Sequence, residues 1–151
     1  MNKSKIVINI DGACLPKNPR GVATYAFIIR CDRKKLAVES GLAGKPYSKE
    51  ATNNTAEYTA YIAALTKAEE LGLTSEQIEV RSDSQLLVNQ LNDKYKVRKP
   101  HLVILHKRAT KLGKQFSKLN VKWIPREENE EADNLTEREY WMYLDKSGKH
   151  Q

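Results

Sequence analysis

Hydrophobic and polar residues alternate along the first part of the chain. In residues 5–11 isoleucine fills every second position, and this period of two predicts a β-strand with one apolar face. Residues 14–21 contain two prolines, an asparagine and a glycine, which predict a loop. Further strands are expected at residues 22–30 and 36–41, joined by a polar hairpin tip. The opening part of the chain therefore predicts an antiparallel meander.

From residue 55 the hydrophobic period lengthens to between three and four residues, which is typical of an amphipathic helix. Gly72 provides a stop signal at the end of this helix. The remaining chain predicts a strand at 77–81, helices at 82–91 and 101–116, a strand at 121–124 and a helix at 129–143. Antiparallel strands followed by crossover helices predict a mixed sheet with helices on its faces.

The chain has 151 residues, of which 40% are hydrophobic, and this is enough for one compact domain with a single core. We expect that domain to cover residues 1–144, and residues 145–151 to form a flexible tail. The sequence holds neither the roughly 18 consecutive apolar residues of a membrane span nor the apolar segment of a signal peptide. These features predict a soluble cytoplasmic protein. Cys14 and Cys31 fit a reducing compartment, although the sequence also allows one disulfide between them.

Basic residues outnumber acidic ones. The chain has 26 Lys and Arg against 19 Asp and Glu, so the net charge is 26 − 19 = +7, and the sequence pI is about 9.4. Such an excess attracts polyanions, and nucleic acid is the commonest polyanion inside cells. Many basic proteins bind no polyanion, so the charge alone indicates a partner without identifying one.

Four acidic residues fall at the ends or first turns of predicted elements. Asp11 closes the first strand, Glu57 lies early in the first helix, Asp83 follows the strand at 77–81, and Asp133 lies early in the last helix. Such ends converge where a sheet with crossover connections opens a ligand crevice. Mg²⁺ prefers carboxylate oxygens, and two ions about 3.5–4 Å apart can hold the attacking and leaving oxygens of a phosphodiester. Without a cysteine or histidine cluster, the acids favour this kind of site over a zinc site.

Each acid, taken alone, also has a structural explanation. Asp11 beside Gly12 could terminate a strand, and Asp83 could cap a helix. Glu57 could be a charge favoured by the helix macrodipole, and Asp133 could be one more solvent-facing acid in the sequence REENEEAD. Only their joint arrangement favours a site.

Four segments resemble the motifs of the ribonuclease HI family in order and spacing. They are NIDGAC (residues 9–14), TNNTAEY (52–58), SDSQLLV (82–88) and PREENEEADNL (125–135). The resemblance extends over residues 5–143 and is greatest to the archaeal-type branch of the family. It implies an α/β, RNase H-like fold with a five-stranded mixed sheet in the order 3-2-1-4-5, flanked by helices. It also implies endonucleolytic, metal-dependent hydrolysis of the RNA strand of an RNA/DNA hybrid, which leaves 5′-phosphate and 3′-hydroxyl ends.

The resemblance implies a catalytic role for the four acids. They would be the metal ligands that hold two Mg²⁺ or Mn²⁺ ions together with the substrate, namely Asp11, Glu57, Asp83 and Asp133. Like charges crowded in this way repel one another, so we expect a mobile or partly protonated site without the ions.

The resemblance also implies a set of substrate-binding residues. The minor groove of a hybrid exposes the 2′-hydroxyls that distinguish RNA from DNA, and an amide can both donate to and accept from a hydroxyl. Asn18, Asn53 and Asn54 would reach that groove, with Gln85 as a weaker candidate. Thr52 would help to hold a phosphate of the DNA strand. The alternative for Asn53 and Asn54 is a helix cap.

The chain departs from the well-studied bacterial form around its last acid. A glycine-rich loop with a histidine, thought there to assist product release, is missing, and His101, His106 and His150 do not match its position. The archaeal-type branch has an arginine at the position of Arg126. This residue would have an auxiliary role toward substrate phosphate or departing product, and its alternative is an ion pair with nearby glutamates.

Two further departures concern binding and packing. The basic, tryptophan-bearing insertion of the bacterial form is absent. Its place is taken by a basic linker, which could contact the phosphates of a nucleic acid or could simply be a solvated linker. Its basic residues are Lys94, Lys96, Arg98 and Lys99. Thr136 stands where the family usually has alanine, which we expect to affect packing more than chemistry.

The expected partner is thus an RNA/DNA hybrid bound by a monomer, with no membrane and no obligate protein partner. Two alternatives keep the same fold. One is a nucleic-acid-binding module that has lost catalysis, which the presence of all four acids disfavours. The other is a related two-metal nuclease that acts on DNA, which the asparagines disfavour.

Overall fold

The computed structural model describes residues 5–148, which form a five-stranded mixed sheet. The strands are β1 (Lys5–Leu15), β2 (Val22–Cys31), β3 (Lys34–Leu42), β4 (Gln77–Ser82) and β5 (Lys118–Trp123). Their spatial order is β3-β2-β1-β4-β5, with β1, β2 and β3 antiparallel and β1, β4 and β5 parallel. The predicted strand order is confirmed.

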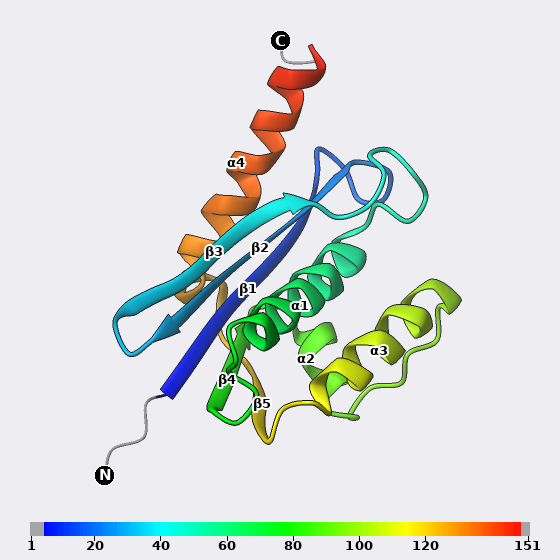
Figure 1. The fold of residues 1–151 in the computed structure, drawn as a ribbon. Helices are drawn as coiled ribbons and strands as arrows, with labels where there is room; N and C mark the ends of the chain where they lie inside the picture. Colours follow the sequence, from blue (N-terminus) through cyan, green and yellow to red (C-terminus); the bar gives the residue numbers. More distant parts are fainter. Residues whose placement is uncertain (1–4, 149–151) are drawn as a thin grey trace.

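Helices cover both faces of this sheet (Figure 1). They are α1 (Asn53–Glu70), α2 (Gln85–Leu91), α3 (Pro100–Gly113) and α4 (Glu130–Ser147), with a short 3₁₀ helix η1 (Arg126–Glu128) before the last. α1 contacts β1 and β2 and packs against α2 and α3, whereas α4 contacts β1, β2 and β3 from the other face.

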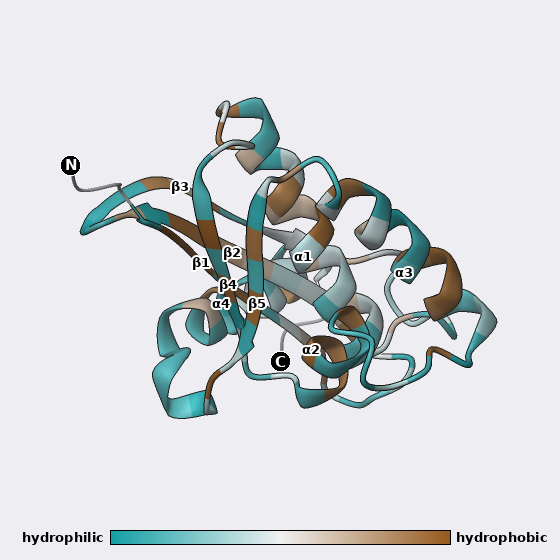
Figure 2. Ribbon diagram, turned by 90° about the horizontal axis from the view of Figure 1, so that it is seen from below, coloured by the Kyte–Doolittle hydropathy of each residue, from teal (hydrophilic) through white to brown (hydrophobic). Residues whose placement is uncertain are grey.

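The main core lies between the sheet and α1. The alternate isoleucines of β1 predicted to form an apolar face are buried there, and each is at most 1% exposed. Tyr58 and Leu65 of α1 and Phe27 of β2 complete this layer. Figure 2 shows hydrophobic residues along the central strands, while many residues of the surrounding loops are hydrophilic. The period of two in β1 therefore places its odd-numbered residues, including Asn9 and Asp11, on the side of α4.

The first strand is longer than the sequence pattern predicts. β1 continues to Leu15 because β2 pairs with it as far as Val22, so the predicted loop at 14–21 begins only after Leu15. Asp11 consequently lies inside a strand, opposite Ala26, and the expectation that it closes the strand is wrong. Pairing with a partner strand has overridden the local turn signals of the sequence.

Other element ends also differ from the predictions. β5 begins at Lys118 because it pairs with β4 along its whole length, and α2 begins only at Gln85. α4 continues to Ser147 because Leu144 is buried against Val22, and Gly148 in the left-handed conformation ends the helix. The predicted flexible tail thus overlaps α4, and residues 149–151 lie outside the described part.

Two sequence expectations concern the surroundings of the protein. Cys14 and Cys31 are both free thiols in the structure, and Cys14 is buried. Within residues 5–148, none of the helices is both long and apolar enough to traverse a bilayer.

Candidate active site

The sheet opens beside β1 at the level of Asp11. The parallel pairing of β1 with β4 ends at Asn9, opposite Arg81, whereas the antiparallel pairing with β2 continues to Leu15. Asp11 therefore lies beyond the last residue of β1 that β4 pairs with. Crevices at such points, where neighbouring connections leave in different directions, are the usual ligand sites of α/β sheets.

Gly12 lets α1 approach β1 closely at this opening. A Cβ at this position would lie 2.4 Å from the backbone carbon of Ala56 and 2.4 Å from the backbone nitrogen of Glu57. The Gly12 backbone N–H favours the charged form of the Glu57 carboxylate and so opposes part of the rise in its pKa that burial causes. The absence of a side chain at Gly12 thus brings the two acids, one on the strand and one on the helix, next to each other.

The start of α1 is fixed by side chains from two segments. Thr52 caps the helix, and its Oγ1 accepts a hydrogen bond from the Thr55 N–H at 3.0 Å. The Asn18 Oδ1 accepts one from the Asn53 N–H at 3.0 Å. Glu57 follows in the second turn and is 7% exposed, so it is not the solvent-facing first-turn charge that the macrodipole alternative requires.

Asp83 directly follows β4. Ser84 caps α2, because its Oγ accepts a hydrogen bond from the Leu87 N–H at 3.1 Å, and the cap explanation for Asp83 is therefore wrong. Asp83 instead lines the same cavity, of about 400 Å³, as Asp11 and Glu57.

These three acids form what we call the carboxylate cluster: Asp11, Glu57 and Asp83. One oxygen of each lies within 4.8 Å of the others. Asp11 and Glu57 are buried and Asp83 is half-buried. The predicted convergence of these three acids is present in the structure.

Burial and mutual repulsion disfavour the charged forms of the cluster. Burial raises the pKa of Asp11 to about 8, and the negative charges of Asp83 and Asp133 add to the effect. Burial likewise raises the pKa of Glu57 well above its ordinary value, with the charges of Asp11 and Asp83 adding to it. Burial also raises the pKa of Asp83. Without a cation, protonated carboxyls are therefore favoured in the cluster.

An unpaired oxygen of Glu57 fits a cation at this position. Over residues 5–148, its Oε1 is the one buried side-chain oxygen or nitrogen without a hydrogen-bond partner. Such an unpaired group costs about 1–3 kcal/mol, and a bound cation would remove that cost. Mg²⁺ and Mn²⁺ are bound mainly by oxygen ligands, whereas zinc sites usually include thiolate or imidazole. The cluster, which consists of carboxylates alone, fits a hard divalent cation.

Asp133 lines the same cavity. Within residues 5–148, however, it is not one of the acids whose oxygens lie within 4.8 Å of one another, so it is not part of the carboxylate cluster. It lies in the first turn of α4, and both its oxygens are 3.5 Å from the Arg126 Nη2. Within residues 5–148, Arg126 thus pairs with Asp133 and not with the nearby glutamates that the alternative named. The Arg126 side chain is 78% exposed, however, and an exposed pair of this kind contributes little stability. The guanidinium remains accessible to a ligand in the cavity.

Asn129 was not singled out in the sequence, yet it is only 1% exposed and joins the sheet to the start of α4. Its Nδ2 donates to the Ile10 backbone oxygen at 2.8 Å and to the Asp83 Oδ2 at 3.4 Å, and its Oδ1 accepts from the Asn9 Nδ2 at 3.1 Å. The asparagine is the first residue of the helix predicted at 129–143, where capping explains it equally well. The pattern alone therefore could not reveal its contact with the cluster.

Replacing Asn129 by alanine is expected to lower the free energy of unfolding by about 2–3 kcal/mol, because it leaves the buried Ile10 oxygen without that partner and removes a donor to Asp83. Urea unfolding measures this change. The matched control is Asn92→Ala, which removes an exposed amide that donates to the Val121 oxygen at 3.1 Å. Equal losses in the two variants would contradict a special role for Asn129.

Thr136 contacts the cluster from α4. It is 1% exposed, and its Oγ1 lies 3.1 Å from the Asp11 Oδ2. The sequence predicts that this residue affects packing more than chemistry, whereas in the structure its hydroxyl lies within hydrogen-bond distance of the Asp11 carboxylate.

The predicted substrate-binding residues are distributed over two cavities that share Asn54. Asn53 and Asn54 line the cavity of the carboxylate cluster. Asn18, Thr52 and again Asn54 line a second cavity of about 290 Å³. Gln85 is exposed at the start of α2, next to a residue that lines the first cavity. The structure thus brings four of these five residues to the walls of the two cavities.

His101 does not match the histidine position of the bacterial form, yet this residue also lines the second cavity. Its Nε2 is 2.8 Å from the Thr55 Oγ1, and Lys49 and Lys99 contribute basic side chains to the same walls. Only the packing of α3 against α1 reveals this position, since no spacing in the sequence links residue 101 to residue 55.

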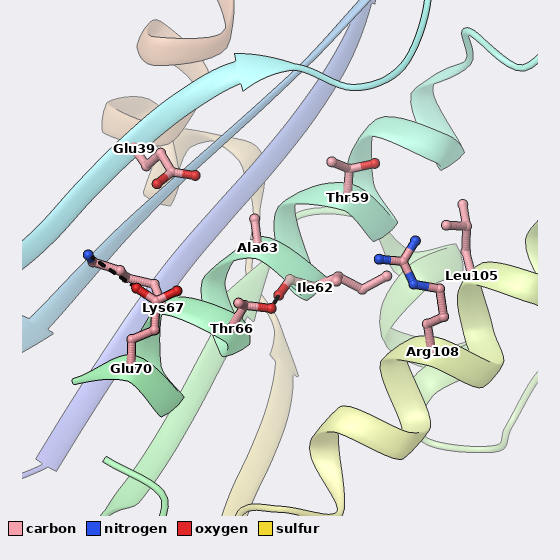
Figure 3. Close-up of a pocket in the computed structure, with 9 residues that line it drawn as sticks. All are labelled: Glu39, Thr59, Ile62, Ala63, Thr66, Lys67, Glu70, Leu105 and Arg108. Carbon is pink, nitrogen blue, oxygen red and sulfur yellow. Dashed lines mark hydrogen bonds and ion pairs between the residues drawn. The ribbon is translucent and has the colours of Figure 1, made fainter. Parts of the chain in front are cut away.

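A third hollow, of about 350 Å³, lies between β3, α1 and α3 (Figure 3). Its charged side chains are of both signs, and Lys67 and Glu70 form an ion pair at 3.7 Å. The Thr66 hydroxyl donates to the Ile62 backbone oxygen. Glu39 accepts a hydrogen bond from the Tyr25 hydroxyl. The charges of this hollow are of both signs, whereas those of the carboxylate cluster are all negative, so the cluster is the candidate active site.

The sequence of the chain is similar to a known protein family and to several proteins in it. A family model described as "Reverse transcriptase-like" matches residues 9–139. The bifunctional protein Rv2228c of Mycobacterium tuberculosis is 37% identical over 131 residues, which are 87% of this chain and 34% of that protein. Ribonuclease HI of Halobacterium salinarum is 42% identical over 85 residues, which are 56% of this chain and 42% of that protein. The chain therefore spans about a third of the length of its mycobacterial relatives.

Solved structures agree with this similarity. The N-terminal RNase H domain of Rv2228c superposes with a TM-score of 0.83 at 32% identity, over 96% of this chain and 99% of that one. LC11-RNase H1, solved in complex with an RNA/DNA hybrid, superposes with a TM-score of 0.82 at 31% identity, over 92% of this chain and 99% of that one.

Proposed function

Because the chain belongs to the ribonuclease HI family, we propose that it is a ribonuclease H, which hydrolyses the RNA strand of RNA/DNA hybrids with the help of divalent metal ions. Cleavage would be endonucleolytic and leave 5′-phosphate and 3′-hydroxyl ends. The ions would be Mg²⁺ or Mn²⁺, and the protein would act as a cytoplasmic monomer. The complex of LC11-RNase H1 with a hybrid supports this choice of substrate.

The convergence of the carboxylate cluster carries this proposal. Three acids from β1, α1 and the end of β4 offer oxygens within 4.8 Å of one another, and one buried oxygen has no partner within the described chain. A purely structural role would not explain three adjacent, like-charged groups whose pKa values are raised by burial and by each other. A site that binds cations explains all of these features.

The proposed roles follow from where each acid lies. Asp11, Glu57 and Asp83 would bind the ions directly, and Asp133 would contribute a fourth carboxylate from the rim of the cavity. Bound divalent ions would supply an activated water and stabilise the charge that develops on the scissile phosphate. A protonated carboxyl is a poor ligand, so bound ions would oppose the raised pKa values of Asp11 and Glu57 and favour their ionised forms.

The amide side chains beside the cluster would select the RNA strand. Asn53 and Asn54 share its cavity and can both donate to and accept from a 2′-hydroxyl. Asn18, on the second cavity, would reach the same minor groove, with Gln85 as a weaker candidate for this role. Thr52, on the second cavity as well, would help to hold a phosphate of the DNA strand. Asn18 already accepts from the Asn53 N–H, so its Nδ2 is the group that would face the substrate.

A cleavage panel tests the proposal. Labelled RNA/DNA hybrid, duplex RNA, duplex DNA and single-stranded RNA are each incubated with the protein and Mg²⁺, Mn²⁺ or EDTA, and the ends of any products are identified. We expect metal-dependent cut sites in the RNA of the hybrid, with 5′-phosphate ends. Binding of the hybrid without cleavage under every metal condition would favour a catalytically silent module. Cleavage of duplex DNA would favour a related DNA nuclease.

Arg126→Ala is expected to slow hybrid cleavage about tenfold, as the loss of one charged contact to phosphate costs roughly 1.4 kcal/mol or more. The thermal midpoint should stay unchanged, because the ion pair of Arg126 with Asp133 is exposed. Steady-state kinetics and a melting curve measure the two effects. Arg126→Lys serves as the control that keeps the charge. A fall in the melting temperature with unchanged turnover would show that Arg126 is structural only.

A further inference from the structure

Thr136 lies behind the carboxylate cluster, in the buried face of α4. Its hydroxyl oxygen is 3.1 Å from the Asp11 Oδ2 and 2.7 Å from the backbone oxygen of Asp133. Its own backbone oxygen accepts a hydrogen bond from the Thr24 Oγ1 at 3.1 Å. Thr136 is not one of the residues that line the cavity, so it reaches the cluster from the side that a ligand would not occupy.

The Thr136 hydroxyl has one hydrogen, which can be donated either to the Asp11 Oδ2 or to the Asp133 backbone oxygen. The Asp133 oxygen is nearer, but it lies inside α4, where the helical pattern already gives it an N–H four residues on. The Asp11 oxygen belongs to a carboxylate, and hydrogen bonds to charged acceptors are about twice as strong as those between neutral groups. When Asp11 is ionised, as it must be to bind a cation, the carboxylate is the better acceptor.

A donor at this point has a specific effect on Asp11. The terminal torsion of an aspartate is broad, so the carboxylate can rotate unless something holds it. The neighbouring charges of Asp83 and Asp133 repel it and would favour rotation away from them. A hydrogen bond to Oδ2 opposes that rotation and leaves the other oxygen unrestrained by Thr136.

We propose that Thr136 is a positioning residue for the metal site: its hydroxyl holds the ionised Asp11 carboxylate from the α4 side, so that the other carboxylate oxygen is oriented toward a divalent cation. The inference deepens the proposed function and rests on it for the identity of the site. Groups that orient metal ligands in this way typically change metal affinity about 10–100-fold when they are removed.

Titration with Mg²⁺ alone tests the proposal. The backbone amide signals of Gly12 and Ser84, which flank two acids of the cluster, report binding by NMR. T136V removes the hydroxyl at nearly constant volume, whereas T136S keeps it. T24V is the matched control, because it removes a buried threonine hydroxyl that donates to a backbone oxygen of the same helix and not to a carboxylate. Urea unfolding of every variant accompanies the titration.

We expect T136V to weaken Mg²⁺ binding about tenfold, and T136S and T24V to bind it within twofold of the unaltered protein. T24V should lose as much stability as T136V, which separates positioning from packing. Unchanged Mg²⁺ affinity in T136V, or an equal loss in T136S, would overturn the proposal. If T136V does not fold, T136A against T136S decides the question in the same way. Absence of hybrid cleavage by the unaltered protein would refute the proposed function, whereas these Mg²⁺ affinities test Thr136 separately.

Discussion

Asp83→Asn is expected to reduce metal-dependent cleavage of an RNA/DNA hybrid by about a thousandfold or more. Stabilisation by a bound metal ion is worth several kcal/mol in the transition state, and each 1.4 kcal/mol corresponds to a factor of about ten in rate. Asparagine keeps the shape of the side chain and its contact with Asn129, but offers a neutral oxygen in place of the carboxylate. Single-turnover cleavage in Mg²⁺ measures the loss.

The fold should survive this substitution. Burial raises the pKa of Asp83, so its charged form is unfavourable in the folded protein without ions, and asparagine removes that charge. The melting temperature in EDTA should therefore be equal or higher. Asp32→Asn is the matched control, since this exposed residue at the β2–β3 hairpin tip has a φ of 56°, which asparagine tolerates. Full activity of Asp83→Asn in Mg²⁺ would refute the proposed site.

The protein without divalent ions is expected to lose stability as the pH rises from about 4 to about 8. Asp11 has an ordinary pKa of 3.8, which burial first and neighbouring charges second raise to about 8 in the folded state. Between these values the folded state holds a proton that the unfolded state has released. The stability that this proton gives is fully present below the unfolded pKa and is lost as the pH rises through the folded pKa, at about 1.4 kcal/mol per pH unit.

Thermal melts in EDTA across this pH range measure the effect, and Asp11→Asn isolates it. The variant cannot titrate at this position, so its melting temperature should fall less between pH 5 and pH 8 than that of the unaltered protein. Addition of Mg²⁺ at pH 8 should restore the melting temperature of the unaltered protein and have a smaller effect on the variant. Parallel pH profiles of the two proteins in EDTA would contradict the raised pKa of Asp11.

The order of elements and the convergence of the acids could be predicted because each depends on a local pattern. A period of two, a change to a helical period and crossover connections are enough to place Asp11, Glu57 and Asp83 near one opening. The predicted end of β1 is wrong because pairing with β2 continues the strand past its local turn signals.

The residues that support the acids could not be predicted in the same way. Asn129 has the sequence context of a helix cap, and Thr136 that of an ordinary helical residue. Their contacts with Asp83 and Asp11 depend on how α4 lies against the sheet, which no spacing along the chain encodes. Roles that arise from docking of one element on another become visible only in three dimensions.

Gly12 lets α1 lie nearer to β1 than any other residue would allow. A Cβ at this position would be 2.4 Å from the backbone of Ala56 and of Glu57, so the approach of strand and helix depends on the absence of a side chain. We therefore expect substitutions deeper in the layer between the sheet and α1 to change the stability of the protein more than they change the separation of Asp11 and Glu57. An engineer could adjust the melting temperature through Leu65 and its neighbours and leave the spacing of the acids as it is.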